Sequence, residues 1–211
     1  MTPRELAPPD QRLDPRAARS RERVLAAAWE LLREGGAAAC SIEAVAAASG
    51  VAKTTIYRQF DDREQLIFAV LEMLKGAPHV PDTGDVVADV EWTLQDLAAG
   101  LFDTSTSTLL ASMIDLAERS GRVRDMLTDF GARRRALLMA RLRRAVDTGD
   151  LRKDVDVDLL VGQLVGPLFY RRYISRQPVS RRYVTRLVRT TLQPLRAQPA
   201  CADDAGGGRA R

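Results

Sequence analysis

The sequence of 211 residues predicts an all-α protein of about nine helices, in which a small N-terminal domain precedes a larger helical bundle. Apolar residues recur at a helical spacing along most of the chain, and no segment of useful length alternates as a strand does. Pro- and Gly-rich breaks separate the helical segments. Hydrophobic residues make up 45% of the chain but aromatic residues only 5%, a composition that suits helices better than sheets.

The first helix is expected to follow a disordered arm. Residues 1–15 contain four prolines and no helical periodicity, and residues 197–211 have the same character, so both ends are predicted to be disordered. An apolar stripe at i, i+3, i+4 and i+7 then predicts a helix that ends at Gly35–Gly36. The stripe consists of Val24, Leu25, Ala28, Leu31 and Leu32.

Three shorter helices complete the N-terminal domain, which is predicted to span residues 16–75. Ser41 fits the N-cap of a helix that runs to about residue 48, and a further helix covers about 52–60. Asp61, with Glu64 three residues later, forms a capping pattern that opens a linking fourth helix.

The segment GAPHVPDTGD ends this domain, because its two prolines and two glycines interrupt the helical pattern. The second domain, residues 76–196, is predicted to contain five helices. They lie at about 84–102, 105–119, 122–148, 156–176 and 179–195. The helix at 122–148 carries an arginine-rich face that we interpret as solvated. That face comprises Arg133, Arg134, Arg135, Arg141, Arg143 and Arg144.

The stretch SIEAVAAASGVAKTTIYRQF, residues 41–60, meets the requirements of a helix-turn-helix. Two short helices that cross steeply need a small residue at the crossing, here Ala46, and a turn residue that tolerates left-handed backbone, here Gly50. Ile56 supplies an apolar anchor on the second helix. Ala46, Gly50 and Ile56 are therefore the predicted core of a helix-turn-helix.

The opposite face of the second helix has the chemistry of a DNA-contacting surface. No acidic residue occurs between Ser49 and Phe60, and cationic and hydroxyl side chains reach phosphates or base edges from a helix in the major groove. Residues 1–75 hold eleven basic and eleven acidic residues, so local arrangement rather than net charge carries this prediction. The predicted DNA-contacting residues are Lys53, Thr54, Thr55, Tyr57, Arg58 and Arg63, and an arm bearing Arg16, Arg19, Arg21 and Arg23 is expected to add backbone or minor-groove contacts.

The stretch VAKTTIYRQFDDREQLIFAVLE resembles the signature of the tetracycline-repressor (TetR/AcrR) family of transcription regulators, and the likeness extends over about residues 19–75. The positions that match the family pattern are Val51, Lys53, Thr55, Tyr57, Phe60, Glu64 and Leu66. Three positions depart from it. Ala52 replaces a common Ser, Thr54 a frequent Gly, and Arg63 the usual Lys, and the first two changes are expected to alter sequence preference.

The stretch AVDTGDLRKDVDVDLLVGQLVGPLFYRRYIS resembles the C-terminal domain of an AcrR-like branch of that family. Gly162 and Gly166 lie four residues apart and would let a second helix approach closely, while Pro167 is expected to kink the helix. The resemblance implies a two-fold interface of four helices, with a contact inside one chain as the alternative. The predicted dimer-interface residues are Gly162, Leu164, Gly166, Tyr173, Val184, Leu187 and Val188.

The resemblance also implies a ligand cavity in the second domain. Its first three helices combine bulky apolar and Met side chains with a few polar groups, a composition equally typical of a cavity and of a filled core. We expect a mostly apolar ligand, with Asp96, Asp103 or Asp115 available to a cationic group. The predicted ligand-binding residues are Trp92, Gln95, Met113, Asp115 and Phe130.

Other chemistry-bearing residues form no catalytic or metal-binding pattern. Cys40 and Cys201 are too few and too far apart for a disulfide framework, and His79 stands in a Pro-flanked linker. The DVDVD run at 154–158 lacks the Gly and the distal Glu of a calcium loop and fits helix N-capping. No apolar run reaches membrane length. We expect no enzymatic activity, cofactor or metal, no membrane partner, and a cytoplasmic location.

The hypothesis is a homodimeric transcription regulator, a repressor that a small apolar ligand releases from a pseudo-palindromic double-stranded DNA operator. Two alternatives stay open at this point. One is a helix-turn-helix DNA-binding protein without a small-molecule ligand. The other is a helical enzyme or lipid-binding bundle that carries a hairpin resembling a helix-turn-helix.

Overall fold

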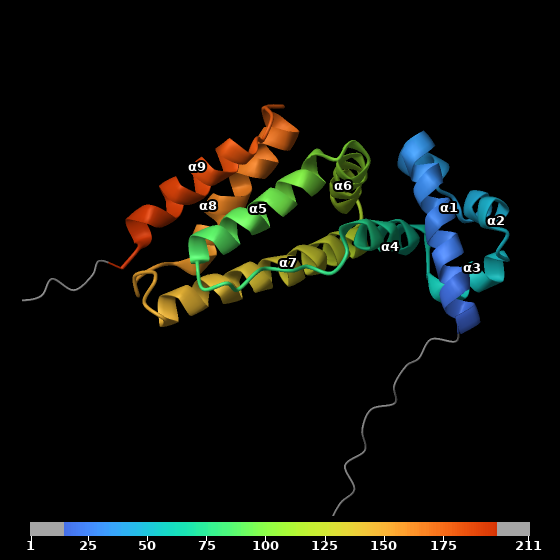
Figure 1. The fold of residues 1–211 in the computed structure, drawn as a ribbon. Helices are drawn as coiled ribbons and strands as arrows, with labels where there is room; N and C mark the ends of the chain where they lie inside the picture. The colour runs from blue at the N-terminus through green and yellow to red at the C-terminus, as the bar shows by residue number, and fades with distance from the viewer. Residues whose placement is uncertain (1–14, 198–211) are drawn as a thin grey trace, which may run out of the picture. The chain divides into compact units, whose positions relative to one another are not determined.

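The computed structural model describes residues 15–197, and Figure 1 shows the arrangement of its helices. The described residues contain nine α-helices and no named strand, which confirms the all-α prediction. The helices are α1 (Pro15–Ala39), α2 (Ile42–Ser49), α3 (Lys53–Gln59), α4 (Arg63–Lys75), α5 (Val86–Phe102), α6 (Thr104–Ala117), α7 (Gly121–Asp147), α8 (Val157–Phe169) and α9 (Arg181–Leu192). A π-helical turn, η1 (Tyr170–Ile174), follows α8, and a 3-10 turn, η2 (Gln193–Leu195), follows α9.

The predicted disordered arm and tail lie outside the described residues, except for Pro15 and Ala197. Pro15 is the first residue of α1 and so belongs to the helix rather than to the arm. Proline is favourable at that position because its ring presets the helical φ and the missing N–H would have no partner in the first turn.

The chain divides into two compact units. Among the described residues, the first contains 15–77 together with Thr104–Leu127, and the second contains Pro78–Asp103 together with 128–197. The sequence prediction instead assigned residues 76–196 to one continuous domain. The difference lies in α6, which packs on α1 and α4 of the first unit. Helical periodicity shows that a segment has an apolar face but does not show which core that face joins.

Local signals account for the boundaries of α1 and α2. Gly36 has φ 65° and ψ −167° and interrupts the helix where the glycine pair predicted its end. Ser41 then caps α2, because its Oγ accepts the N–H of Ala44 at 3.0 Å. The N-cap prediction for Ser41 is confirmed.

Asp62 rather than Asp61 is the N-cap of α4, so the predicted cap is wrong by one residue. The Oδ1 of Asp62 accepts the N–H of Gln65 at 2.7 Å, and the Oε1 of Gln65 accepts the N–H of Asp61 at 2.6 Å. Two adjacent acids both match the capping pattern, and the backbone turn after α3 selects between them. The helix that follows buries every side chain from Leu66 to Leu71.

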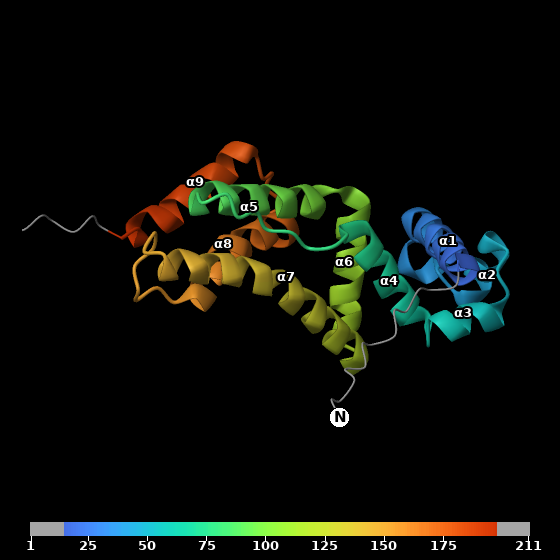
Figure 2. The same cartoon turned by 60° about the horizontal axis from the view of Figure 1, so that its bottom comes forward.

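The helices α5, α8 and α9 pack side by side in the second unit, as Figures 1 and 2 both show. α8 buries Leu160, Leu164 and Leu168, and α9 buries Val184, Val188 and Leu192. Residues four apart share one face of a helix, so these two stripes form the contact between the helices of one chain. These two stripes include residues that the sequence prediction assigned to the interface between two chains.

Pro167 lies in the last turn of α8, and the chain continues beyond it as the π-helical turn η1. The N–H of Tyr170 is shared between the carbonyls of Gly166 and Pro167, and the N–H of Ser175 donates to the carbonyl of Tyr170 at 2.9 Å. The interruption expected at this proline therefore takes the form of a change from α-helical to π-helical hydrogen bonding.

The arginine-rich face of α7 is exposed at four of its six predicted positions, but one member turns inward. Arg133, Arg135, Arg143 and Arg144 are exposed, whereas Arg141 is buried. The prediction of a solvated Arg141 is therefore wrong. The arginine can be buried because a carboxylate of α5 lies opposite its guanidinium group.

Candidate nucleic-acid interface

The turn between α2 and α3 has the backbone that the sequence predicted. Gly50 adopts the left-handed conformation, with φ 65° and ψ 22°, and its N–H donates to the carbonyl of Ala46 at 3.0 Å. A Cβ atom added at Gly50 would lie 2.9 Å from Nη2 of Arg23. Position 50 therefore favours glycine for its backbone conformation and for the space that Arg23 takes.

A small apolar core lies beneath this turn. The side chains of Val45 and Ile56 are fully buried, and Val51 and Phe60 are nearly so. Ile56 is thus the inward anchor that the sequence predicted, while Ala46 is half-buried at the turn. The inward position of Ile56 determines which side chains of α3 face outward.

The outward face of α3 carries the predicted DNA-contacting residues. Lys53, Thr54, Tyr57 and Arg58 are exposed, and Thr55 is partly exposed. Half of the Tyr57 surface is accessible, a large fraction for an aromatic residue. Ala52, which stands where the family pattern has a serine, caps α3 without a side-chain hydrogen bond.

An ion pair joins the first residue of α3 to the first turn of α2. The Nζ of Lys53 lies 3.0 Å from Oε1 of Glu43, and both side chains are exposed. The hydrogen bond from Lys53 lowers the pKa of the Glu43 carboxyl. α3 itself contains no acid, and the sequence gives no signal that this acid of the preceding helix lies beside Lys53.

Arg63 has a structural role that the sequence did not reveal. Its Nε donates to the carbonyl of Cys40 at 2.8 Å, and its Nη2 donates to the carbonyl of Ala37. These bonds attach the start of α4 to the end of α1. Burial raises the pKa of the Cys40 thiol to about 11, although the nearby Arg63 charge opposes that rise.

Two arginines assigned to the N-terminal arm lie on α1 and face the helix-turn-helix. Arg23 donates from Nη2 to the carbonyl of Ser49, and the Arg21 guanidinium lies 4.5 Å from the centroid of the Phe60 ring. Arg16 and Arg19 also belong to α1. The prediction that these four residues form an arm is therefore wrong, because the apolar stripe marks only the buried part of a helix that begins earlier.

The predicted ligand-binding residues are divided between the two units. Met113 is buried in the first unit, and Asp115, also in that unit, is exposed and paired with Arg119 at 2.5 Å. The expectation that Asp115 faces an interior ligand is wrong.

Trp92 and Gln95 lie on α5 in the second unit, where Trp92 is 46% exposed and contacts the ring of His79 edge to face. Phe130 lies under the guanidinium group of Arg134.

The predicted dimer-interface residues fall into two groups. Leu164, Val184 and Val188 are buried within one chain, so their assignment to an interface between chains is wrong. Gly162 and Gly166 are exposed on α8, and a Cβ atom added at either would meet nothing within 4 Å. Tyr173 and Leu187 are partly exposed. The alternative, an internal core contact, therefore holds for the buried group.

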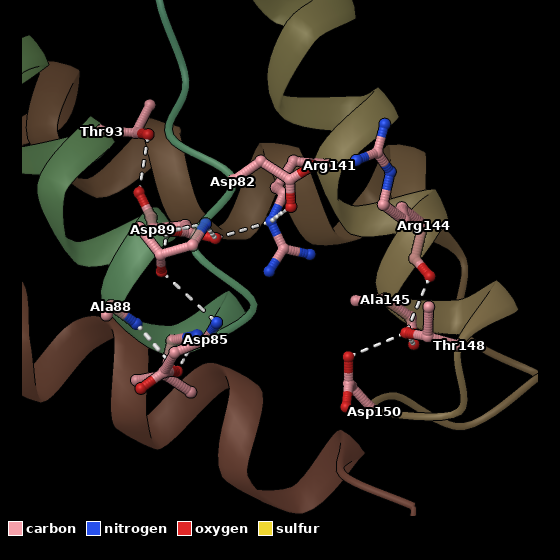
Figure 3. Close-up of polar contacts among 12 residues, drawn as sticks. Asp82, Asp85, Ala88, Asp89, Thr93, Arg141, Arg144, Ala145, Thr148 and Asp150 are labelled. Carbon is pink, nitrogen blue, oxygen red and sulfur yellow. Dashed lines mark hydrogen bonds and ion pairs between the residues drawn. The ribbon is translucent and has the colours of Figure 1, made fainter.

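A buried ion pair of the second unit was not foreseen by sequence reasoning (Figure 3). The Nε of Arg141 on α7 lies 2.7 Å from Oδ2 of Asp89 on α5, and the hydroxyl of Thr83 donates to Oδ1 of Asp89 at 2.7 Å. Burial acts to raise the pKa of Asp89, but the hydrogen bonds from Thr83 and Arg141 outweigh it and hold the pKa below its ordinary value.

The acidic run at 154–158 acts in capping and ion pairing. Oδ1 of Asp156 accepts the N–H of Leu159 at 3.0 Å and caps α8, which confirms the capping prediction. Asp154 pairs with Arg152, and Asp158 pairs with Arg135. Within residues 15–197, no group of three or more His, Cys, Asp or Glu side chains is arranged to hold a metal ion.

A braced turn between two short helices, with a cationic and hydroxyl face on the second, defines a helix-turn-helix DNA-binding protein. Comparison with known proteins agrees. The family model for bacterial regulatory proteins of the tetR family matches residues 24–70, and the model for the tetracyclin repressor-like C-terminal domain matches residues 80–191. The chain belongs to the tetR family and is a transcriptional regulator.

Individual relatives extend this likeness over most of the chain. It is 28% identical to an HTH-type transcriptional regulator, YdeS of Bacillus subtilis, over 88% of this chain and 94% of that protein. It is 30% identical to the DNA-binding transcriptional repressor TetR of Mycobacteroides abscessus, over 82% of this chain and 91% of that protein. The crystal structure of the TetR family transcription regulator SCO0332 matches with 35% identity and a TM-score of 0.69, covering 83% of this chain and 98% of the other.

None of the helices between residues 15 and 197 combines the length and the apolar character that crossing a membrane requires.

Proposed function

We propose that this regulator is a homodimer that represses transcription from a pseudo-palindromic operator and leaves the DNA when a small, mostly apolar ligand binds its second unit. The observation that carries the proposal is the outward face of α3, where Lys53, Tyr57 and Arg58 project from a helix that Ile56 anchors and Arg23 braces. A rigidly held cationic and hydroxyl face of this size suits the major groove of double-stranded DNA.

In this proposal, Thr54 and Tyr57 donate to phosphate oxygens, while Lys53, Thr55 and Arg58 contact either phosphates or base edges. Arg63 contributes its positive charge beside α3, although two of its nitrogens already donate to backbone carbonyls. A dimer with one such helix in each chain would bind two half-sites about 34 Å apart or a multiple of that distance.

The dimer is proposed to form through an exposed apolar stripe along α8 and η1. Leu159, Tyr170 and Ile174 are 59%, 58% and 71% exposed, and Gly162 and Gly166 lie between them at helical spacing. Such a stripe would be unfavourable in water, and the two glycines would let a partner helix approach closely. This stripe replaces the buried residues that the sequence had assigned to the interface.

The ligand response is proposed for the second unit, where α5, α7 and α8 carry mostly apolar buried side chains. A ligand releases the DNA only through its different affinity for the bound and free conformations. The relative named TetR in Mycobacteroides abscessus is described as a repressor, which supports the direction of regulation. We place the regulator in the cytoplasm, with DNA as its partner, and assign it no enzymatic activity.

Fluorescence anisotropy with the DNA that flanks the protein's own gene tests the proposal. We expect sequence-specific binding by a dimer, and release of the DNA by at least one compound of a broad apolar library, with quenching of Trp92 emission over the same concentration range. Specific binding without release by any compound would favour the alternative of a DNA-binding protein with no small-molecule ligand. Binding by a monomer would contradict the proposed interface.

A further inference from the structure

Arg141 has more hydrogen-bonding capacity than its ion pair uses. Its side chain is 5% exposed, and its Nε lies 2.7 Å from Oδ2 of Asp89 and 3.3 Å from Oδ1 of Asp82. The Nη2 atom is also buried, but it has no hydrogen-bond partner among residues 15–197. In Figure 3 the guanidinium group extends from α7 toward α5, and its terminal nitrogens carry no dashed line.

An unpartnered buried N–H group is unfavourable, because it has lost its hydrogen bonds to water and gained none from the protein. A buried polar atom of this kind therefore requires an acceptor that the protein itself does not supply, either a bound water molecule or a ligand atom. In a unit proposed to bind a small molecule, that acceptor can belong to the ligand.

The charges around Arg141 indicate which kind of acceptor fits. Asp82 and Asp89 bring two negative charges, and Arg141 and Arg144 bring two positive charges, with Arg144 in contact with the same Asp82 carboxylate. The four groups are therefore neutral as a set. An anionic ligand would add an uncompensated charge beside the buried Arg141–Asp89 pair, whereas a neutral carbonyl or ether oxygen would accept the hydrogen bond without this penalty.

The neighbouring buried side chains indicate the rest of the ligand. On α7, Leu138 and Ala145 are buried about one turn before and after Arg141, and on α5 Val86 is buried about one turn before Asp89. The backbones of α5 and α7 do not pack as closely as those of α5 and α9, and the long Arg141 side chain spans the distance. Buried apolar residues thus lie near the buried donor on both helices, a combination that suits a small-molecule site.

We propose that Nη2 of Arg141 donates a hydrogen bond to a neutral acceptor, such as a ketone carbonyl, at the polar end of an otherwise apolar ligand. This inference rests on the proposed ligand response and names the chemistry of the ligand and its polar anchor. It also replaces the sequence expectation of a cationic group that pairs with an aspartate.

The test uses Prodan, a neutral naphthalene ketone whose emission moves to longer wavelength when its carbonyl accepts a hydrogen bond. The full-length protein is titrated with Prodan, and 2-decanone and decanoate then compete for it, because they share a ten-carbon chain and differ in charge. Arg141→Lys retains a cation opposite Asp89 but removes the Nη2 donor. Arg143→Lys makes the same change at an exposed position of α7 and is the control. Circular dichroism and thermal unfolding establish that both variants are folded.

We expect Prodan bound to the wild-type protein or to Arg143→Lys to emit at shorter wavelength than free Prodan in water, where solvent also hydrogen-bonds the carbonyl. Both proteins should prefer 2-decanone over decanoate. Prodan bound to Arg141→Lys should emit at a still shorter wavelength, because its carbonyl has lost the donor. It should also bind about tenfold or more weakly, the effect of losing one hydrogen bond from a charged donor. If Arg141→Lys is unfolded, the double variant Asp89→Leu/Arg141→Met takes its place, because it removes both charges together.

Three results would overturn the inference. They are a preference for decanoate, wild-type behaviour of a folded Arg141 variant, and failure of the wild-type protein to bind Prodan at all. Operator binding is measured separately by anisotropy. Prodan binding through Arg141 without release of the operator would contradict the proposed ligand response and leave the binding site intact.

Discussion

The Nζ of Lys53, the first residue of α3, lies 3.0 Å from Oε1 of Glu43 in the first turn of α2. In free protein the cation at the start of the predicted recognition helix thus has a carboxylate partner. A phosphate that binds Lys53 has to compete with Glu43, and the Glu43 charge also repels the DNA backbone. Glu43 is therefore expected to weaken binding to any DNA sequence.

Glu43→Gln should tighten binding to the operator and to unrelated DNA alike, by about two- to fivefold at low salt, the range of an exposed ion pair. The ratio of specific to non-specific affinity should change little, because phosphate contacts do not distinguish sequences. Anisotropy titrations at several salt concentrations measure both quantities. Glu34→Gln, an exposed acid on α1, is the control and should bind as the wild type does.

The double variant Lys53→Ala/Tyr57→Ala should bind all DNA sequences more weakly, because it removes two donors from the exposed face of α3. The slope of log affinity against log salt concentration should become shallower by about 1, since one cationic phosphate contact is lost. Unchanged affinity and slope in a folded double variant would remove α3 from the DNA interface.

Arg63→Ala should lower the free energy of unfolding by about 1–3 kcal/mol, because the carbonyls of Ala37 and Cys40 lose their donor. Arg63→Lys should recover only part of the loss, since an ammonium group does not reproduce the two-pronged geometry of a guanidinium group. Urea unfolding measures the difference. If Arg63→Ala is as stable as the wild type but binds DNA more weakly, Arg63 contacts phosphate and has no structural role.

Gly166→Leu should weaken the dimer, because a large side chain would project from the exposed stripe on α8. The fold of the single chain should be unaffected, since a Cβ atom at Gly166 meets nothing within 4 Å. Gly131→Leu on α7 is a matched control, as Gly131 is also an exposed helical glycine with open space around it. Sedimentation should show a dimer for Gly131→Leu and a monomer for Gly166→Leu. If Gly166→Leu remains a dimer as Gly131→Leu does, the interface lies elsewhere.

Asp89 should make stability depend on pH in the acid range. Its folded-state pKa lies below the unfolded value of about 3.9, so its contribution is fully present above that value and is lost as the pH falls through the folded pKa. Asp89→Asn should lower the free energy of unfolding at neutral pH by about 3 kcal/mol and lose less stability below about pH 4 than the wild type does. Urea unfolding from pH 7 to pH 2.5 makes this comparison.

Local sequence signals predicted the helix-turn-helix well. The conformation of Gly50, the cap at Ser41 and the burial of Ile56 each follow from a residue and its near neighbours, and each appears in the structure as expected. Signals of this kind are reliable because turn backbone, helix caps and helical periodicity depend on contacts within a few residues. The error at Asp61 arose where two adjacent residues carried the same signal.

Long-range contacts account for the residues whose roles were missed. Nothing in the sequence around Arg63 or Arg23 indicates that each donates to a carbonyl 26 residues away along the chain. Arginine has a similar helical preference whether it is solvated or buried, so periodicity alone did not separate Arg141 from the exposed arginines of α7. Its burial depends on Asp89, which lies 52 positions earlier.

The sequence by itself determined the helices, the turn geometry and the chemical character of the α3 face, because these follow from local backbone preferences and from the period of apolar residues. The tertiary structure alone decided which apolar stripe meets another within the chain and which stays exposed. Leu164 and Gly166 lie two positions apart on α8, yet the first packs inside the second unit and the second faces outward. Both residues fit an interface by type, and only the packing of α9 and α5 against α8 assigns one of them to the core.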